Sequence, residues 1–306
     1  MKIIITGGAG FIASHIADAY IKKGHTVVLI DNLVTGFKRN INPKAKFYNA
    51  DIRNVESIER IFKKEKPEIV CHYAAIVEVI KSIIDPNTTY EVNILGTSNV
   101  ARLFGKYGVG RKKKFIFASS GGTVYGNAKN IPTTEDEPTI PESPYGLSKL
   151  LGEEFVTFYA RQFGFNYCIF RYPNVYGPRQ NPKGEAGVTA IFAGLMKKGE
   201  RPTIFGDGKK MRDYVFVEDI VRANMLALSR GENVILNIGS GKPTSDRDIF
   251  DIIVLETRFF GEHIYAPHRK GEAYIIALSA KRAKRVLGWR PTIHVKEGIC
   301  RVVRAL

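Results

Sequence analysis

The chain has 306 residues, of which 44% are apolar and 25% charged, and its 46 Lys and Arg exceed its 30 Asp and Glu by 16. The apolar fraction excludes an intrinsically disordered chain, because it is enough to bury a large core. A positive surplus attracts polyanions, so nucleic acid, an anionic membrane surface and an anionic small molecule are all open as partners. A lysine-rich surface typical of thermophilic proteins is a further explanation, and the presence of only two Gln favours it.

The cysteines and the N-terminal segment bear on the cellular compartment. Three Cys, at 71, 168 and 300, form no CxxC pair and lie in apolar runs, so we expect buried thiols and a reducing compartment. The chain opens on a predicted strand with no signal-peptide pattern, and no apolar run approaches the roughly 18 residues of a membrane span. The histidines have no ligand spacing to one another or to Cys. These patterns predict a cytoplasmic protein with no membrane segment and no metal site.

In the first half of the chain, short β-branched runs alternate with helical patterns, which is typical of βαβ units around a parallel sheet. Past residue 172 turns become frequent, which indicates a second, smaller lobe, although a strand at 214–217 could return to the first sheet. We expect a Rossmann-type doubly wound α/β fold, with residues 1–172 as a dinucleotide-binding domain and 173–306 mainly as a substrate-binding lobe. In chain order, the expected elements are strand 2–6, helix 12–23, strands 26–30 and 46–49, helix 57–64, strand 69–73, helix 93–107, strand 114–118, helix 145–163 and strand 166–170.

A glycine-rich turn follows the first predicted strand directly and opens the first predicted helix. Glycines such as Gly7 and Gly10 let the backbone turn tightly and approach a pyrophosphate, whose charge then lies at the positive end of the helix. Asp31 closes the second predicted strand about 20 residues on, where a carboxylate accepts hydrogen bonds from ribose hydroxyls and repels a 2′-phosphate. The pattern predicts a dinucleotide site that prefers NAD to NADP, although Lys38 and Arg39 nearby weaken that preference.

Tyr145 and Lys149 form a candidate catalytic pair. They follow Pro144, which suits the first turn of a helix, and their spacing places both side chains on one helix face. An ammonium near a phenol favours the phenolate and so lowers a pKa that is about 10 when unperturbed. Taken alone, such a pair is more often a packed ring beside a solvated amine. A hydroxyl-rich turn at 118–126 ends another predicted strand at the carboxyl edge of the sheet, where ligands bind in this architecture, and it favours the catalytic interpretation.

Together these residues resemble the extended short-chain dehydrogenase/reductase family, in particular its nucleotide-sugar branch and most closely the UDP-glucose 4-epimerases. The likeness runs along nearly the whole chain and is far more specific than any one motif. Besides the glycine turn, the hydroxyl-rich turn and the Tyr–Lys motif, the matching segments are 31–33, 51–53, 72–75, 92–97, 171–179, 212–217 and 287–291.

The resemblance implies a role for each matching residue. Those that correspond to NAD contacts are Gly7, Gly10, Phe11, Ile12, Asp31, Asn32, Asp51, Ile52, Tyr73, Ala74, Ala75, Val77, Asn93, Ser119, Lys149 and Pro173. Of these, Asp51 and Ile52 correspond to contacts with the adenine. Those that correspond to contacts with a UDP-sugar are Asn174, Val188, Arg212, Arg269 and Glu272. Guanidinium groups such as those of the two arginines suit a diphosphate.

The sequence departs from the family pattern at one catalytic position. The hydroxyl residue that usually bridges the sugar O4 and the tyrosine falls on Gly121. Either Ser120 or Thr123 replaces it, or Tyr145 contacts the substrate oxygen directly, and we expect Thr123. In members that accept N-acetylated sugars a small residue opens the wall of the sugar pocket, and its counterpart is Ile276 or Ala277. We expect N-acetyl sugars to be accepted if Ala277 holds that place.

The reaction that the resemblance implies is the interconversion of UDP-galactose and UDP-glucose. Tyr145, as phenolate and assisted by Lys149, takes the proton of the C4 hydroxyl while C4 gives its hydride to NAD, leaving a transient 4-keto sugar and NADH. The ketone swings about its phosphate link, and the hydride returns to the opposite face. The nucleotide must therefore be held tightly and the hexose loosely. The resemblance also implies a homodimer whose interface is a helix pair that includes residues 93–107 and 145–163.

Other functions stay open at this point. A 4,6-dehydratase would need a carboxylate in the hydroxyl-rich turn, where this chain has Gly121, Gly122 and Thr123. Epimerases of N-acetylhexosamine, glucuronate or pentose nucleotides share every motif used here. A non-enzymatic basic binding protein would explain the charge surplus and the run 111–114, but no nucleic-acid-binding motif accompanies that run. We therefore expect a UDP-sugar as partner and neither nucleic acid nor a membrane.

Overall fold

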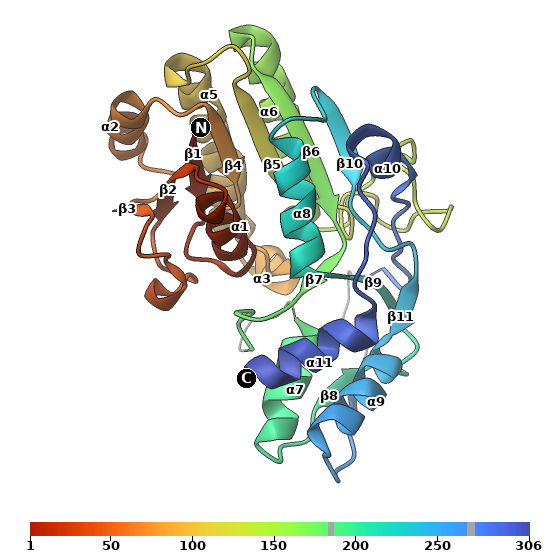
Figure 1. The fold of residues 1–306 in the computed structure, drawn as a ribbon. Coiled ribbons are helices and arrows are strands. Elements are labelled where there is room, and N and C mark those ends of the chain that lie inside the picture. The colour runs from red at the N-terminus through yellow and green to blue at the C-terminus, as the bar shows by residue number, and fades with distance from the viewer. Residues whose placement is uncertain (183–186, 268–272) are drawn as a thin grey trace.

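The computed structural model describes residues 1–182, 187–267 and 273–306, and its centre is a seven-stranded parallel sheet (Figure 1). The strand order is β10-β6-β5-β4-β1-β2-β3. The chain adds β2 and β3 on one side of β1 and then β4, β5 and β6 on the other side, as in a doubly wound fold. The predicted α/β class is therefore confirmed. Its strands are β1 (Lys2–Thr6), β2 (Thr26–Asp31), β3 (Lys46–Asn49), β4 (Ile69–His72), β5 (Lys114–Ser120), β6 (Asn166–Tyr172) and β10 (Val234–Asn237).

Both faces of this sheet are buried, which explains why its strands read as continuous apolar runs. Along β1, Ile3 and Ile5 point to one face while Ile4 points to the other, and each face has its own apolar cluster. The first face is covered by α1 (Phe11–Lys22), α8 (Val217–Ala227) and α10 (Lys281–Leu287), and the second by α2 (Val55–Glu65), α5 (Gly96–Tyr107) and α6 (Pro144–Phe163).

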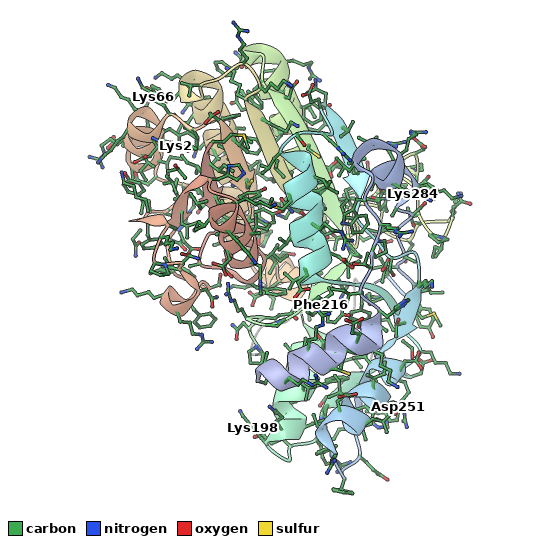
Figure 2. The ribbon with its side chains drawn as sticks, viewed as in Figure 1. Lys2, Lys66, Lys198, Phe216, Asp251 and Lys284 are labelled. Atoms are coloured by element: carbon green, nitrogen blue, oxygen red, sulfur yellow. The ribbon has the colours of Figure 1, made fainter. Side chains whose placement is uncertain are left out.

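A smaller lobe lies beyond the carboxyl edge of the sheet (Figure 1). It contains a three-stranded sheet and a two-stranded sheet, packed with three helices around a separate apolar cluster that includes Phe216 (Figure 2). Its strands are β7 (Asn174–Tyr176), β8 (Thr203–Phe205), β9 (Met211–Phe216), β11 (Pro243–Ser245) and β12 (Ile264–Ala266), and its helices are α7 (Val188–Lys197), α9 (Asp246–Thr257) and α11 (Val295–Ala305).

Most predicted elements are present with ends shifted by one or two residues, and two differences are larger. The strand expected at 214–217 is β9, which pairs with β7 and β11 in the small lobe, and the strand that returns to the large sheet is β10. The helix expected to begin at residue 93 begins at Gly96, because Glu91–Leu95 is wound as a π-helix. Short segments α3 (Val79–Ile84), α4 (Pro86–Tyr90) and a 3-10 turn (Lys38–Asn40) complete the described elements. The domain division at residue 172 stays a prediction.

The surplus of cations is spread over both lobes. Lys66, Lys198 and Lys284 are exposed and lie at well-separated points on the outline of the molecule (Figure 2). Such a distribution favours a lysine-rich surface over one face built for a polyanion. Within the described ranges, no helix combines the length and the apolar character needed to cross a membrane.

Candidate active site

The carboxyl ends of β1, β4, β5 and β6 meet at one edge of the large sheet, and a cavity of about 760 Å³ extends from this edge to the small lobe. Of the predicted site residues that the structure describes, only Asn93 and Ala277 do not line it. Its lining includes Gly7, Gly10, Phe11, Ile12, Asp31, Asn32, Asp51, Ile52, Tyr73, Ala74, Ala75, Val77, Ser119, Ser120, Thr123, Tyr145, Lys149, Pro173, Asn174, Val188, Arg212 and Ile276. One cavity thus joins the predicted cofactor and substrate residues.

The turn between β1 and α1 has the form that a diphosphate requires. Gly7 has a left-handed φ of +68°, and a Cβ there would lie 2.7 Å from the backbone nitrogen of Ala74. Only glycine permits this close approach of the turn to the segment after β4. The first turn of α1 has neither a side-chain cap nor an acidic residue, and its first residues Phe11 and Ile12 line the cavity. The positive end of this helix is therefore available to an anionic ligand.

Asp31 stands at the end of β2, where it supports this turn. Its Oδ2 accepts a hydrogen bond from the Ala9 backbone N–H (3.0 Å) and its Oδ1 accepts one from Leu33 (2.7 Å). Each carboxylate oxygen retains a second acceptor position for a ribose hydroxyl. Lys38 and Arg39 do not line the cavity, and the Arg39 guanidinium stacks on Phe37. The residues present therefore fit NAD, and neither Lys38 nor Arg39 is placed to bind a 2′-phosphate.

The predicted adenine end contains an ion pair that the sequence did not point to. Arg53 holds Asp51 with two hydrogen bonds to separate oxygens, Nε to Oδ1 (3.1 Å) and a terminal nitrogen to Oδ2 (2.8 Å), and it also reaches Glu91. The Asn32 amide donates to the same carboxylate at 3.0 Å. The Arg53 hydrogen bond is the main cause that lowers the pKa of Asp51 to about 2. Asp51 is therefore a fixed anion at neutral pH.

Asn93, which was expected to contact the dinucleotide, lies behind the cavity wall. It is buried within the π-helical segment, its Oδ1 accepts from the Ile76 backbone N–H at 2.8 Å, and its Nδ2 donates to the Ile76 carbonyl at 2.9 Å. It also donates to Ser148 of α6. Asn93 thus fixes the backbone that carries Ala74, Ala75 and Val77, so its support of the cavity is indirect.

The candidate catalytic pair projects from the first turns of α6. Ser143 caps this helix by accepting from the Gly146 N–H, and Pro144 begins it. Tyr145 and Lys149 are both buried, and the Lys149 ammonium donates to the Ala118 carbonyl at 2.9 Å while lying 5.9 Å from the centre of the Tyr145 ring. The predicted proximity of the two groups is therefore observed.

The ionisation of this pair differs from the sequence-based expectation. Burial raises the pKa of Tyr145 to about 12, although its interaction with Ser120 opposes the rise, and burial lowers the pKa of Lys149 to about 8. Burial disfavours the charged form of each group, and for Tyr145 it outweighs the interaction with Ser120. In the protein alone, the phenol of Tyr145 is therefore protonated at neutral pH.

The structure favours Ser120, and not the expected Thr123, as the hydroxyl that replaces the missing one. Ser120 already interacts with the Tyr145 side chain, whereas Thr123, which lines the same cavity, has no hydrogen bond to Tyr145. A Cβ on Gly121 would lie 2.4 Å from Leu278 Cδ1, so a side chain there would require Leu278 to move. The packing of Leu278 on the turn explains why the hydroxyl moves to a neighbouring position.

The small lobe supplies polar groups to the other end of the cavity. Asn174, Val188 and Arg212 line it as expected, and the Arg212 guanidinium donates to the Met211 carbonyl at 2.9 Å. Two hydroxyls missed by sequence reasoning, on Thr189 and Tyr214, also line this end, and both oxygens are buried with no partner among the described residues. Such orphaned donors indicate a polar ligand. The predicted contacts Arg269 and Glu272 lie outside the described residues.

The wall beside the hydroxyl-rich turn is formed by Ile276 and not by Ala277. Ile276 lines the cavity, and its Cδ1 lies 3.7 Å from the point where a Cβ on Gly122 would be. Ala277 is fully buried, and its carbonyl accepts from the Thr133 N–H. The condition under which N-acetyl sugars were expected to be accepted is therefore not met.

Comparison with known proteins extends the likeness to both lobes. The model of the NAD dependent epimerase/dehydratase family matches residues 3–239. A Methanocaldococcus jannaschii protein, named provisionally as a UDP-glucose 4-epimerase, is 50% identical over 301 residues, which cover 98% of this chain and 97% of that protein.

Solved structures that match the whole chain include two UDP-glucose 4-epimerases. The Thermotoga maritima UDP-glucose 4-epimerase with UDP-glucose is 44% identical with a TM-score of 0.97, and the match covers 100% of this chain and 98% of the other. The Thermus thermophilus UDP-glucose 4-epimerase in complex with NAD is 38% identical with a TM-score of 0.95, again over 100% and 98% of the two chains. The likeness therefore includes the cavity and all the elements that line it.

Proposed function

This chain belongs to the NAD-dependent epimerase/dehydratase family, and from that premise we propose that it interconverts UDP-galactose and UDP-glucose by inverting C4 of the sugar. The observation that carries the proposal is the position of Tyr145, Lys149 and Ser120. They line one cavity between the glycine turn, which fits a dinucleotide, and the polar end in the small lobe. Groups that move a proton are thus placed between two nucleotide-binding ends.

When bound, NAD supplies a hydride acceptor and donor for C4 and a positive charge that favours the phenolate of Tyr145. The phenolate takes the proton from the C4 hydroxyl and later returns it to the same oxygen. Ser120 forms a hydrogen bond to that oxygen and to the tyrosine. The Lys149 ammonium stays against the Ala118 carbonyl and stabilises the negative charge on Tyr145.

The two ends of the cavity hold the substrate unequally. Arg212, Thr189 and Tyr214 bind the nucleotide and diphosphate, together with Arg269 and Glu272 by resemblance, while the sugar faces the apolar side chain of Ile276. Because the binding contacts are concentrated on the part that does not react, the sugar can rotate and present its opposite face between the two hydride transfers. The hydroxyl-rich turn has no carboxylate at 121–123, which speaks against a 4,6-dehydratase.

The test is incubation of the purified protein with UDP-galactose, followed by chromatographic separation of the UDP-hexoses. We expect conversion to UDP-glucose, approached from either substrate to the same final ratio. Tyr145→Phe, which keeps the ring and removes the hydroxyl, should lose nearly all turnover, whereas Tyr265→Phe, an exposed ring that does not line the cavity, should keep it. An absence of product from wild-type protein supplied with NAD would refute the proposal.

We further propose a homodimer through the outer faces of α5 and α6. These helices pack side by side on the sheet, and apolar side chains on or beside them remain exposed, at 57% for Leu95, 38% for Leu147 and 50% for Phe158. Light scattering should give twice the chain mass. Phe158→Glu should give monomers and Phe260→Glu, on a fully exposed ring elsewhere, should not. A monomeric wild-type protein would contradict this proposal.

A further inference from the structure

A buried carboxylate lies one helical turn beyond Lys149. Glu153 on α6 is 1% exposed and does not line the cavity. Side chains four residues apart share a face of a helix, so Glu153 lies on the same side of α6 as Lys149. A carboxylate is almost never buried to this extent unless it is paired, so the residues that it contacts indicate its role.

The contacts of Glu153 join the catalytic helix to two strands. Its Oε1 accepts hydrogen bonds from the Ser119 hydroxyl and from Arg171 Nε (2.9 Å), and its Oε2 accepts from a second Arg171 nitrogen at 2.7 Å. Ser119 on β5 directly follows Ala118, whose carbonyl holds the Lys149 ammonium. Arg171 on β6 lies two residues before Pro173 at the cavity. One carboxylate therefore ties α6 to both strand ends that carry the site.

The titratable, polar and aromatic groups around Lys149 come from three elements. From its own helix it faces Tyr145 and Glu153, from β4 it faces His72, and β5 contributes the Ala118 carbonyl and the ring of Phe117. Burial lowers the pKa of His72 to about 3, so this group is neutral at physiological pH. Within the described part of the chain, Glu153 is thus the anion that opposes the loss of the Lys149 proton.

Resting on the proposed function, we propose that Glu153 is a positioning residue of the reaction: its carboxylate keeps the Lys149 ammonium charged and seated against the Ala118 carbonyl. Arg171 and Ser119 orient that carboxylate and satisfy its remaining acceptor positions. The role differs from that of Tyr145 and Lys149, because Glu153 touches neither the cavity nor a reacting atom. Its effect on the reaction passes through the charge of Lys149.

The first test is Glu153→Gln, which keeps the shape and one acceptor oxygen but removes the charge. Lysine labelled with ¹³C at Cε reports the titration of Lys149 directly by NMR, with the signal assigned by its absence in Lys149→Met. We expect the midpoint for Lys149 to fall by at least about one pH unit. The basic limb of the kcat profile with UDP-galactose should move to lower pH by the same amount. For a fall of about one unit from a pKa of about 8, kcat at pH 7 should drop about twofold and kcat at pH 8 about fivefold, with KM little changed.

Asp219→Asn is the matched control. Asp219 is another fully buried carboxylate, which accepts from the Thr292 hydroxyl at 2.8 Å and from two backbone N–H groups, but it does not face Lys149. Its loss should lower the melting temperature while leaving the Lys149 titration and the pH profile in place. An unchanged Lys149 midpoint in folded Glu153→Gln would overturn the proposal, and so would an equal shift in Asp219→Asn.

A second variant covers the case in which Glu153→Gln does not fold because Arg171 is left buried without a counter-ion. The double variant Glu153→Met/Arg171→Met replaces the ion pair by apolar side chains, an exchange that proteins often tolerate. The Lys149 midpoint should again lie below the wild-type value, and a wild-type midpoint would refute the inference. Absence of turnover in wild-type protein would contradict the proposed function alone, since the NMR titration of Lys149 would still decide the role of Glu153.

Discussion

Removal of the Ser120 hydroxyl tests which side chain completes the catalytic set. Ser120→Ala takes away the group that interacts with Tyr145 and leaves the turn backbone, including Gly121 against Leu278, unchanged. The interaction with Ser120 lowers the pKa of Tyr145, so its loss raises that pKa. A base with a higher pKa is deprotonated only at higher pH, so the acidic limb of the kcat profile should move to higher pH.

The size of the effect follows from the kind of hydrogen bond that is lost. A hydrogen bond to a charged group contributes about 1.5–3 kcal/mol, and each 1.4 kcal/mol of barrier is about tenfold in rate. Ser120→Ala should therefore lower kcat for UDP-galactose by about 10- to 150-fold. The assay measures initial rates of UDP-glucose formation across pH, with substrate well above KM.

Thr123→Val is the matched control, because it removes the neighbouring hydroxyl from the same turn without changing the shape of the side chain. Because Ser120 is the hydroxyl that interacts with Tyr145, loss of the Thr123 hydroxyl should change kcat less than about twofold. The Thr123 hydroxyl makes no hydrogen bond to the described residues, so its loss should not lower stability. A larger loss in Thr123→Val than in Ser120→Ala would show that the substitute hydroxyl was wrongly chosen. Wild-type turnover in both would mean that Tyr145 acts without a bridge.

Three further predictions concern the sugar wall, the core and the adenine end. Ile276→Ala removes side-chain volume beside the hydroxyl-rich turn and should raise the turnover of UDP-N-acetylglucosamine at least about tenfold relative to UDP-glucose. Lys114 is 2% exposed and donates to two carbonyls at the end of α8, so Lys114→Met should lower the free energy of unfolding by about 2–4 kcal/mol in urea titrations. The pKa of Asp51 is lowered to about 2, so its ionised form stabilises the fold above the unfolded pKa of about 4 and the contribution disappears as pH falls to 2. Asp51→Asn in the NAD-free protein should therefore cost about 1–2 kcal/mol at pH 6, a figure reduced for the partial exposure of Arg53, and almost nothing at pH 2.

Each of these has a control in the same chain. Ile276→Val leaves most of the wall and should not alter the preference between sugars. Lys112→Met removes an exposed amine and should leave the unfolding free energy within about 0.5 kcal/mol of wild type. Glu200→Gln, on an exposed carboxylate, should leave the unfolding free energy at pH 6 within about 0.5 kcal/mol of wild type. A cost of Asp51→Asn that stays constant from pH 6 to pH 2 would be incompatible with the ion pair described here.

The parts of the site that could be predicted are those set by neighbouring residues. The glycine turn, Asp31 at the end of its strand and the spacing of Tyr145 and Lys149 are local patterns, and the structure brings them to one cavity as expected. The alternation of strand and helix patterns in the sequence likewise predicted the large parallel sheet. In each case the position of a side chain follows from the period of its own helix or strand.

The parts that could not be predicted depend on contacts between distant segments. The lack of a side chain at Gly121 goes with the packing of Leu278, which reaches the turn from more than 150 residues away. The register of the segment that contains Leu278 also decides that Ile276 faces the cavity. The pKa of Tyr145 was predicted in the wrong direction because the sequence shows the nearby ammonium but not the depth of burial. Such features arise from tertiary packing, which has no local signal.

Because β10 returns to the large sheet from late in the chain, this sheet cannot be completed until most of the chain has been synthesised. By residue 172 the chain has emerged with six strands of that sheet, yet β6 is still an open edge, because its partner β10 is 62 residues further on. The apolar face that α8 covers is open for the same interval. An exposed strand edge and an uncovered apolar face both favour association between nascent chains. The first half, although it contains the dinucleotide turn and the Tyr–Lys pair, therefore depends on the second to become a closed and monodisperse fold.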